Sequence, residues 1–344
     1  MRGSLPIGRT LGALAGATLL AAGLSGPAAA SDDHHRDHDH QCQHRQPQGP
    51  LAVRVLGSGG PVMENQRASA GYVFYVDGEP RLLMDAGGGT AVRLGEARVD
   101  AAKIDAVMLS HLHIDHSTDL PAILKSAYFQ GRGEQPIDVY GPTGGGPYPS
   151  VSDWLDGLYA EGSGGGIYRY MHLFAKQVAG GVFHVNGHDI DAGLGNPGIR
   201  SVYQGDGVSV QAVPVKHGPA PALAYRVDYR DRSITFSGDL NSDTGNLVDL
   251  ARGTDVLIYD TSLNSDVPKG TPASALHSYP AEVGKAAAAA GARTLVLSHL
   301  MPPALKQLDQ VVATVAEHFD GRILVAHDGM LVEPDRHRAE GDDD

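Results

Sequence analysis

The chain has 344 residues, of which 42% are hydrophobic and 19% are charged, so it is not a disordered protein and can bury one large core or two smaller ones. Its formal net charge of −13 argues against a protein that grips long nucleic acid by positive charge. The single cysteine, Cys42, excludes both an intramolecular disulfide framework and a cysteine-based zinc site.

The N-terminus has the pattern of an export signal. Arg2 and Arg9 make a basic start, residues 10–24 are apolar and rich in small side chains, and residues 28–30 offer a cleavage site. The apolar stretch is short for a membrane span, although an uncleaved N-terminal anchor is the alternative. We therefore predict a signal peptide over 1–30, export to the periplasm or the medium, and no membrane contact after cleavage.

Residues 31–50 are predicted to be a disordered linker that contains a histidine tract. The segment has no hydrophobic period and ends in Gln, Pro and Gly. Imidazole and carboxylate groups bind divalent metals, so this tract is either a metal-capturing segment or a solvated tail. At the other end of the chain, residues 335–344 are predicted to form an acidic tail.

From Leu51 onward the chain alternates apolar strands with helical patterns. The predicted strands are 51–56, 72–76, 82–84, 104–109, 208–213, 223–227, 234–236, 256–259, 295–297 and 323–325. The predicted helices are 119–129, 152–159, 280–290 and 304–318. Between the two strand-rich halves, a segment rich in glycine and aromatic residues is predicted to be an insertion at about 141–200. This order predicts two packed sheets with helices outside, an α/β protein.

Chemically active side chains gather where strands end. His111 and His113 directly follow the apolar run 104–109. They alternate, so in extended backbone they point the same way, as two ligands of one ion would. Asp115 and His116 follow at the turn, placed for a second ion, and zinc, manganese and iron all accept such nitrogen and oxygen ligands.

The pattern His-x-His-x-Asp-His over 111–116 resembles the signature of the metallo-β-lactamase superfamily, and the resemblance extends over most of 51–334. Asp85 begins a segment that resembles the Asp-x-Gly turn of that family. His217 fits its third histidine, Asp239 its metal-bridging aspartate and His299 its last histidine. The resemblance implies a hydrolase with a four-layer αββα metallo-β-lactamase sandwich and two divalent metal ions, most readily Zn²⁺, at the sheet edges. The implied metal ligands are His111, His113, Asp115, His116, His217, Asp239 and His299.

Within the superfamily, the ribonuclease Z-like branch is the most similar. Residues 56–61 and 67–72 resemble its opening loop, and 277–282 resemble a His-led motif that opens a helix. The resemblance implies that His277 assists proton transfer to the leaving group, which makes Asp115 and His277 the candidate catalytic residues. Asp85 and Asp260 are candidate hydrogen-bond acceptors for ligand imidazoles, with structural caps as the alternative.

Two features differ from the tRNA-processing members of that branch. The tRNA-processing members carry His-Glu-Ala-Thr where this chain has Tyr-Asp-Thr-Ser at 259–262. Those members also use a basic arm, whereas residues 141–200 of this chain include few basic residues. The insertion is more similar to those of exported arylsulfatase-like and phosphodiesterase-like relatives. The expected partners are therefore a small-molecule ester substrate and a possible homodimer, with no long nucleic acid.

The resulting prediction is an exported dinuclear zinc hydrolase of phosphodiesters or aryl sulfate esters, with a metal-bridged hydroxide as nucleophile. One alternative is an acyl hydrolase of the lactonase or β-lactamase type, which would share the metal site. Another is a non-enzymatic extracytoplasmic metal-binding protein that works through the histidine tract.

Overall fold

The computed structural model of this protein describes residues 45–62, 66–195, 198–242 and 245–335. The predicted signal peptide, the histidine tract and most of the predicted acidic tail lie outside these ranges. Residues 45–50, at the end of the segment predicted to be disordered, have defined contacts, because the N–H groups of Gln48 and Gly49 donate to Glu333 Oε1 at 2.6 and 2.7 Å. No helix in the described ranges is long and apolar enough to cross a membrane.

Among the described residues, seven strands form a first sheet, in the order β14-β1-β2-β3-β4-β5-β6. These strands are β1 (Leu51–Gly57), β2 (Gly71–Val76), β3 (Glu79–Ala86), β4 (Ala106–Met108), β5 (Ile137–Pro142), β6 (Val185–Ile190) and β14 (Leu331–Val332). The pairs from β14 to β3 are antiparallel and those from β3 to β6 are parallel. Every residue of β1 and β2 is buried, as expected for strands that are covered on both faces.

A second sheet has the order β13-β12-β11-β10-β9-β8-β7. Its strands are β7 (Arg200–Gly205), β8 (Val208–His217), β9 (Ala220–Tyr229), β10 (Arg232–Phe236), β11 (Val256–Asp260), β12 (Thr294–Ser298) and β13 (Arg322–Val325). The pairs from β7 to β10 are antiparallel and those from β10 to β13 are parallel. Because parallel strands end at the same edge of a sheet, the segments that follow β10, β11 and β12 meet there.

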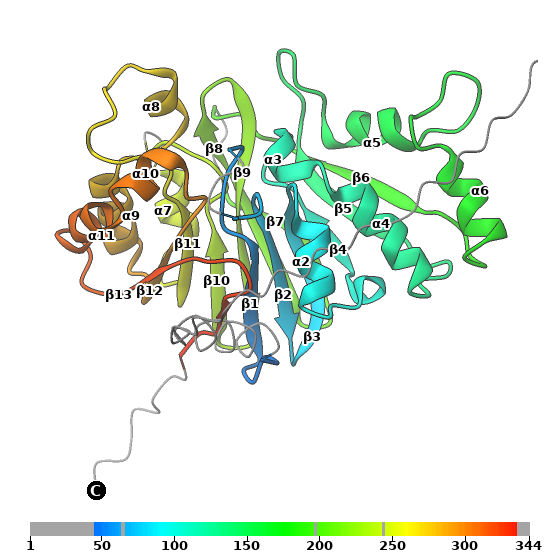
Figure 1. The fold of residues 1–344 in the computed structure, drawn as a ribbon, viewed down its shortest axis with the longest axis horizontal. Helices are drawn as coiled ribbons and strands as arrows, with labels where there is room; N and C mark the ends of the chain where they lie inside the picture. Colours follow the sequence, from blue (N-terminus) through cyan, green and yellow to red (C-terminus); the bar gives the residue numbers. More distant parts are fainter. Residues whose placement is uncertain (1–44, 63–65, 196–197, 243–244, 336–344) are drawn as a thin grey trace, which may run out of the picture.

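The two sheets pack face to face through an apolar core. Phe74 and Met84 of the first sheet and Tyr225 and Phe236 of the second belong to this buried cluster. Figure 1 shows the sheets side by side in the middle of the molecule, with helices on either side. This arrangement confirms the predicted four-layer α/β sandwich.

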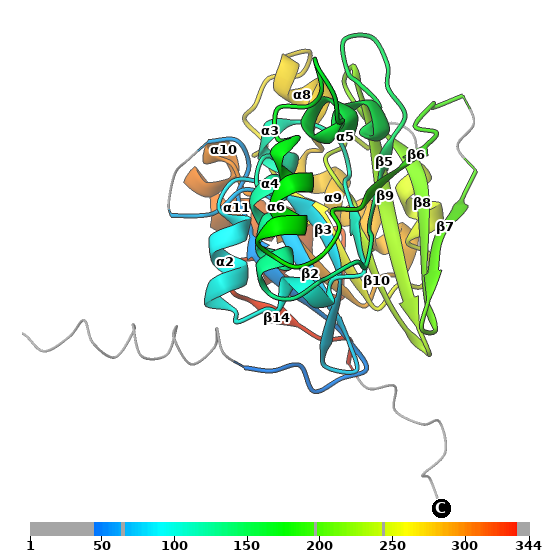
Figure 2. The same ribbon diagram turned by 90° about the vertical axis from the view of Figure 1, so that its right-hand side faces the viewer.

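Helices cover the outer face of each sheet. The first sheet is covered by α2 (Thr90–Glu96), α4 (Leu120–Phe129), α5 (Val151–Tyr159) and α6 (Tyr170–Gln177), and Figure 2 views the molecule from this side. The second sheet is covered by α7 (Asn246–Leu250), α9 (Pro280–Ala290), α10 (Pro302–Lys306) and α11 (Leu308–Ala316). The short elements η1 (Ala101–Lys103), α3 (Ile114–Ser117) and α8 (Pro272–Leu276) lie in the connections.

The observed elements differ from the predicted ones in several places. Residues 141–200 are more regular than their glycine content suggested, because they include α5, α6 and β6. The helix predicted over 304–318 is two helices, since Gln307 has φ −132° and interrupts it. Strands β5, β6, β7 and β14 were not predicted.

Candidate metal centre

The loop that follows β4 carries the first four candidate ligands. His111 and His113 lie in this loop, and Asp115 and His116 lie in α3 directly after it. Asp85, at the end of the adjacent strand β3, fixes the start of the loop by accepting hydrogen bonds from Ser110 N at 2.7 Å and Ser110 Oγ at 2.8 Å.

A glycine is required where the turn after β3 approaches α3. A Cβ atom at Gly87 would lie 2.0 Å from the carbonyl oxygen of Asp115, a distance that real Cβ atoms essentially never show. The Asp-x-Gly turn therefore allows the two backbones to pack closely, which places Asp115 beside the other candidate ligands.

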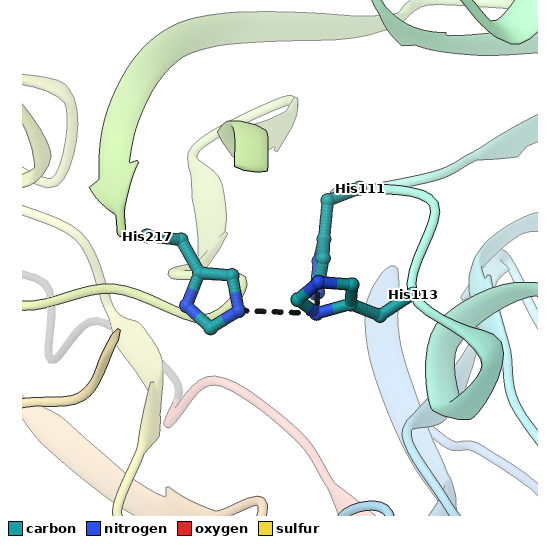
Figure 3. A group of neighbouring side chains, drawn as sticks. All are labelled: His111, His113 and His217. Atoms are coloured by element: carbon teal, nitrogen blue, oxygen red, sulfur yellow. Dashed lines mark hydrogen bonds between the residues drawn. The ribbon is translucent and has the colours of Figure 1, made fainter. Parts of the chain in front are cut away.

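Three histidines form the first group of candidate ligands. His217, at the end of β8, brings its ring to the rings of His111 and His113, as Figure 3 shows. The Nδ1 atom of His113 lies 2.9 Å from His111 Nε2 and 3.2 Å from His217 Nε2. The other ring nitrogen of His217, Nδ1, donates to the carbonyl oxygen of Leu276 at 2.9 Å, which leaves Nε2 to face the group.

Asp115, His116, Asp239 and His299 form the second group, and their ligand atoms all lie within 4.8 Å of one another. Asp239 follows β10, and its Oδ2 atom lies 3.3 Å from Nε2 of His116 and 3.3 Å from Nε2 of His299. His299 directly follows β12 with φ +53°, a backbone conformation that is uncommon outside glycine. Its Nε2 atom also lies 3.3 Å from Oδ2 of Asp115.

Asp239 lies between the two groups. The same Oδ2 atom that contacts His116 and His299 is 3.8 Å from Nε2 of His217 in the first group. The carboxylate is buried, with 3% of the residue exposed. This is the place that the sequence analysis predicted for a bridging ligand.

Further side chains orient the rings of two histidines by contacting Nδ1, the ring nitrogen that does not face the cluster. Asp85 Oδ2 accepts from His116 Nδ1 at 2.7 Å, and Ser262 Oγ lies 2.8 Å from His299 Nδ1. Both contacts leave the Nε2 atom of the ring facing the cluster. Asp85 was a candidate for this role in the sequence, whereas Ser262 was missed, because a serine two residues beyond Asp260 carries no local signal.

His277 and Asp260 form a buried pair beside the cluster. His277 Nδ1 donates to Asp260 Oδ2 at 2.6 Å, and the His277 ring stacks on the His299 ring with centroids 5.7 Å apart. Asp260, the last residue of β11, also lies 3.5 Å from His299 Nδ1 through its other oxygen. Tyr148 was missed in the sequence, and its hydroxyl lies 3.4 Å from His113 Nε2.

The histidines of the two groups have pKa values that are shifted in opposite directions. Burial lowers the pKa of His111 and His113 and brings the pKa of His217 to about 4, so these rings are neutral at pH 7. Burial also opposes charge on His116 and His299, but the neighbouring Asp239 and other carboxylates outweigh it. The pKa of His116 is raised well above its usual value, and that of His299 is raised to about 10.

The residues fit two divalent metal ions. Five imidazoles and two carboxylates converge in a largely buried place, and such mixed nitrogen and oxygen donors suit zinc and similar ions. The facing Nε2 atoms of His116 and His299, 3.2 Å apart, also suit ligands of a common cation. All seven predicted ligand residues are brought together.

Comparison with known proteins agrees with this geometry. Residues 80–300 match the model of the beta-lactamase superfamily domain. The chain belongs to the beta-lactamase superfamily. It is 30% identical over 295 residues to ribonuclease Z of Mycolicibacterium paratuberculosis, covering 83% of this chain and 99% of that protein. The ribonuclease Z of Mycobacterium marinum is also 30% identical, over 82% of this chain and 98% of that protein.

Solved structures show the same fold. The short form of human tRNase Z has a TM-score of 0.62 and 23% identity, covering 83% of this chain and all of that chain. The metallo-β-lactamase-fold protein YhfI of Bacillus subtilis has a TM-score of 0.60 and 22% identity, over 83% of this chain and 99% of that chain. This beta-lactamase superfamily member therefore has the fold of a metal-dependent hydrolase and is similar to ribonuclease Z.

The prediction that excluded long nucleic acid as a partner is wrong. The curated relatives that this chain covers almost from end to end are named ribonuclease Z, and a ribonuclease acts on RNA. The prediction relied on the scarcity of basic residues in 141–200 and on the net charge of −13, which averages over the whole chain. That average does not report the local field at a site that holds metal ions, where the largest local charges are the ions themselves.

Proposed function

We propose that this protein is a phosphodiesterase that holds two divalent ions and uses His277 to protonate the leaving oxygen. Zinc is the first candidate for these ions. The observation that carries the proposal is the buried hydrogen bond of 2.6 Å between His277 and Asp260, directly beside the ligand cluster. A second function class with the same ligands, acyl hydrolysis, also expels an oxygen or nitrogen atom that needs a proton, so the substrate panel below separates the two classes.

His277 and the cluster have separate tasks in this proposal. Bound divalent ions would lower the pKa of a water molecule and polarise the oxygens of the phosphate. Because Asp260 outweighs the effect of burial, the pKa of His277 is raised, which favours the protonated ring that a proton donor requires. Its Nδ1 is engaged by Asp260, so Nε2 is the atom that donates to the departing oxygen.

Aryl sulfate esters are the second candidate substrates. Tyr148 places an aromatic ring 5.7 Å from the ring of His113, the most exposed of the histidines in the first group. An aromatic ester group can pack against such a ring. Export is proposed from the basic and apolar pattern of residues 1–30, and cell fractionation with mass analysis of the N-terminus tests it.

One panel of substrates tests the proposed activity. Metal-depleted and zinc-reconstituted protein is assayed with bis(p-nitrophenyl) phosphate, p-nitrophenyl sulfate, a precursor tRNA, a lactone and a cephalosporin. We expect zinc to restore hydrolysis of the phosphodiester, whether small or polynucleotide. Zinc-dependent turnover of the lactone or the cephalosporin alone would contradict the proposal.

A further inference from the structure

A recess opens directly beside the second ligand group. It has a volume of about 780 Å³ and lies between the loop after β1, the start of α2 and α3. Asp115 belongs both to its lining and to the ligand group, so the recess borders the metal centre. The apolar side chains in its lining include Ala68, Val92 and Ile114.

Two of these side chains are apolar and unusually exposed. Ile114 is 77% exposed although it stands between His113 and Asp115, and Val92 in α2 is 65% exposed. Neither contributes much to the core, and a polar residue at either position would be better solvated. Apolar surface gathered at the rim of a catalytic centre indicates contact with a ligand.

The two arginines that line the recess are already engaged. Arg93 Nε lies 3.1 Å from Asp328 Oδ2, and Arg67 donates to Ser58 Oγ at 2.6 Å. The N-terminus of α2 could attract an anion, but Asp119 Oδ2 accepts from the N–H groups of Gly89 and Ala91 at 2.9 and 3.0 Å. The recess therefore suits an uncharged group better than a second phosphate.

The wall of the recess is firmly held. Asp328 Oδ2 accepts from Ala68 N at 2.8 Å, while Oδ1 accepts from Ser58 N at 3.0 Å. The loop also pairs with the segment after β12, since Leu300 N donates to Ser58 O at 2.8 Å. A binding surface that is fixed in advance loses little conformational freedom when it binds a ligand.

We propose that this recess binds the uncharged aryl or alkyl group on the non-leaving oxygen of a phosphodiester substrate. The proposal rests on the proposed function, in which the leaving oxygen faces His277, a residue outside the recess. The ester group that remains on phosphorus then faces Asp115 and the recess. The recess thereby selects esters with an apolar group on that side.

The test compares two esters that share one leaving group, methyl p-nitrophenyl phosphate and phenyl p-nitrophenyl phosphate. We expect the zinc-loaded enzyme to prefer the phenyl ester by about 10-fold or more in kcat/KM, because apolar surface is buried only with the phenyl group. Val92→Asp should abolish most of this preference, through a raised KM for the phenyl ester. An aspartate in the first turn of α2 is compatible with the helix.

Val178→Asp is the matched control, because Val178 is 64% exposed at the end of α6 and does not line the recess. An unchanged phenyl preference in Val92→Asp, or an equal loss in Val178→Asp, would overturn the proposal. A thymidine 5′-p-nitrophenyl ester that exceeds the phenyl ester and depends on Val92 would also overturn it, by assigning the recess to a nucleoside. Failure to hydrolyse any of the esters would instead refute the proposed phosphodiesterase function.

Discussion

His277 donates through Nδ1 to Oδ2 of Asp260 over 2.6 Å, and both side chains are buried next to the ligand cluster. A buried carboxylate in this position stabilises the protonated form of the imidazole and fixes the ring so that Nε2 faces away from it. The pair therefore supplies a proton donor that is distinct from the seven candidate metal ligands.

Replacing His277 with alanine should separate leaving-group chemistry from metal chemistry. A nitrophenolate departs without assistance, whereas an alkoxide needs a proton in the transition state. His277→Ala should lose about 100-fold in kcat on an alkyl or nucleoside ester, equivalent to about 3 kcal/mol, and much less on an activated nitrophenyl ester. Metal content should be unchanged. Equal losses on both esters would indicate a role in substrate binding or folding instead.

Removing the bridging carboxylate should empty part of the metal centre. The parent protein, truncated before Pro50 to exclude the histidine tract, should contain about two ions per chain by elemental analysis. Asp239→Ala should bind about one or fewer and lose activity by at least about 10³-fold, because the anion shared by both groups is gone. The exposed Asp249 provides the control Asp249→Ala, which should match the parent. Near-normal turnover in Asp239→Ala would show that Asp239 is not the bridge.

Asp85 should influence metal affinity without contacting the metal. Asparagine at this position can still accept from Ser110 but can present its amide N–H₂ to His116 Nδ1, so the ring orientation is lost. Asp85→Asn should weaken zinc binding by about 10–100-fold in competition with a chromogenic chelator. Circular dichroism should show a folded chain, and wild-type affinity in this variant would assign Asp85 a purely structural role.

Zinc binding to the metal-free protein at pH 7 should release protons from the second ligand group, because rings with raised pKa values bind zinc only in the neutral form. The pKa values of His116 and His299 are raised, to about 10 for His299, so both rings lose a proton when they become ligands. His111, His113 and His217 have lowered pKa values and release none. Affinity at the second group should therefore rise with pH up to about the pKa of His299. Calorimetric heats that do not depend on the buffer's ionisation enthalpy would contradict this.

The strands of the inner sheets could be predicted because they are buried on both faces and appear as apolar runs, as in β11 and β12. The edge strands β6 and β7 are only partly buried and carry polar residues such as Asn186 and Gln204, so hydrophobicity does not reveal them. Strand β14 has two residues and depends entirely on pairing with β1.

The candidate site was predictable to the extent that its residues form local motifs. The ligands at 111–116 are spaced by alternation and by one helical turn, and the others each follow an apolar run. Ser262 and Tyr148 could not be found this way, because their roles depend on contacts with His299 and His113 across more than 30 residues. The exclusion of long nucleic acid was wrong because net charge and the composition of one insertion do not describe the site.

The candidate ligands are divided between the two halves of the sandwich. His111, His113, Asp115 and His116 come from the first half, whereas His217, Asp239 and His299 come from the second. Ions bound there would link the two sheets across their interface, because neither half alone can complete either site. Metal binding would then raise the free energy of unfolding by about RT ln(1 + [L]/Kd). A strong chelator would remove this stabilisation.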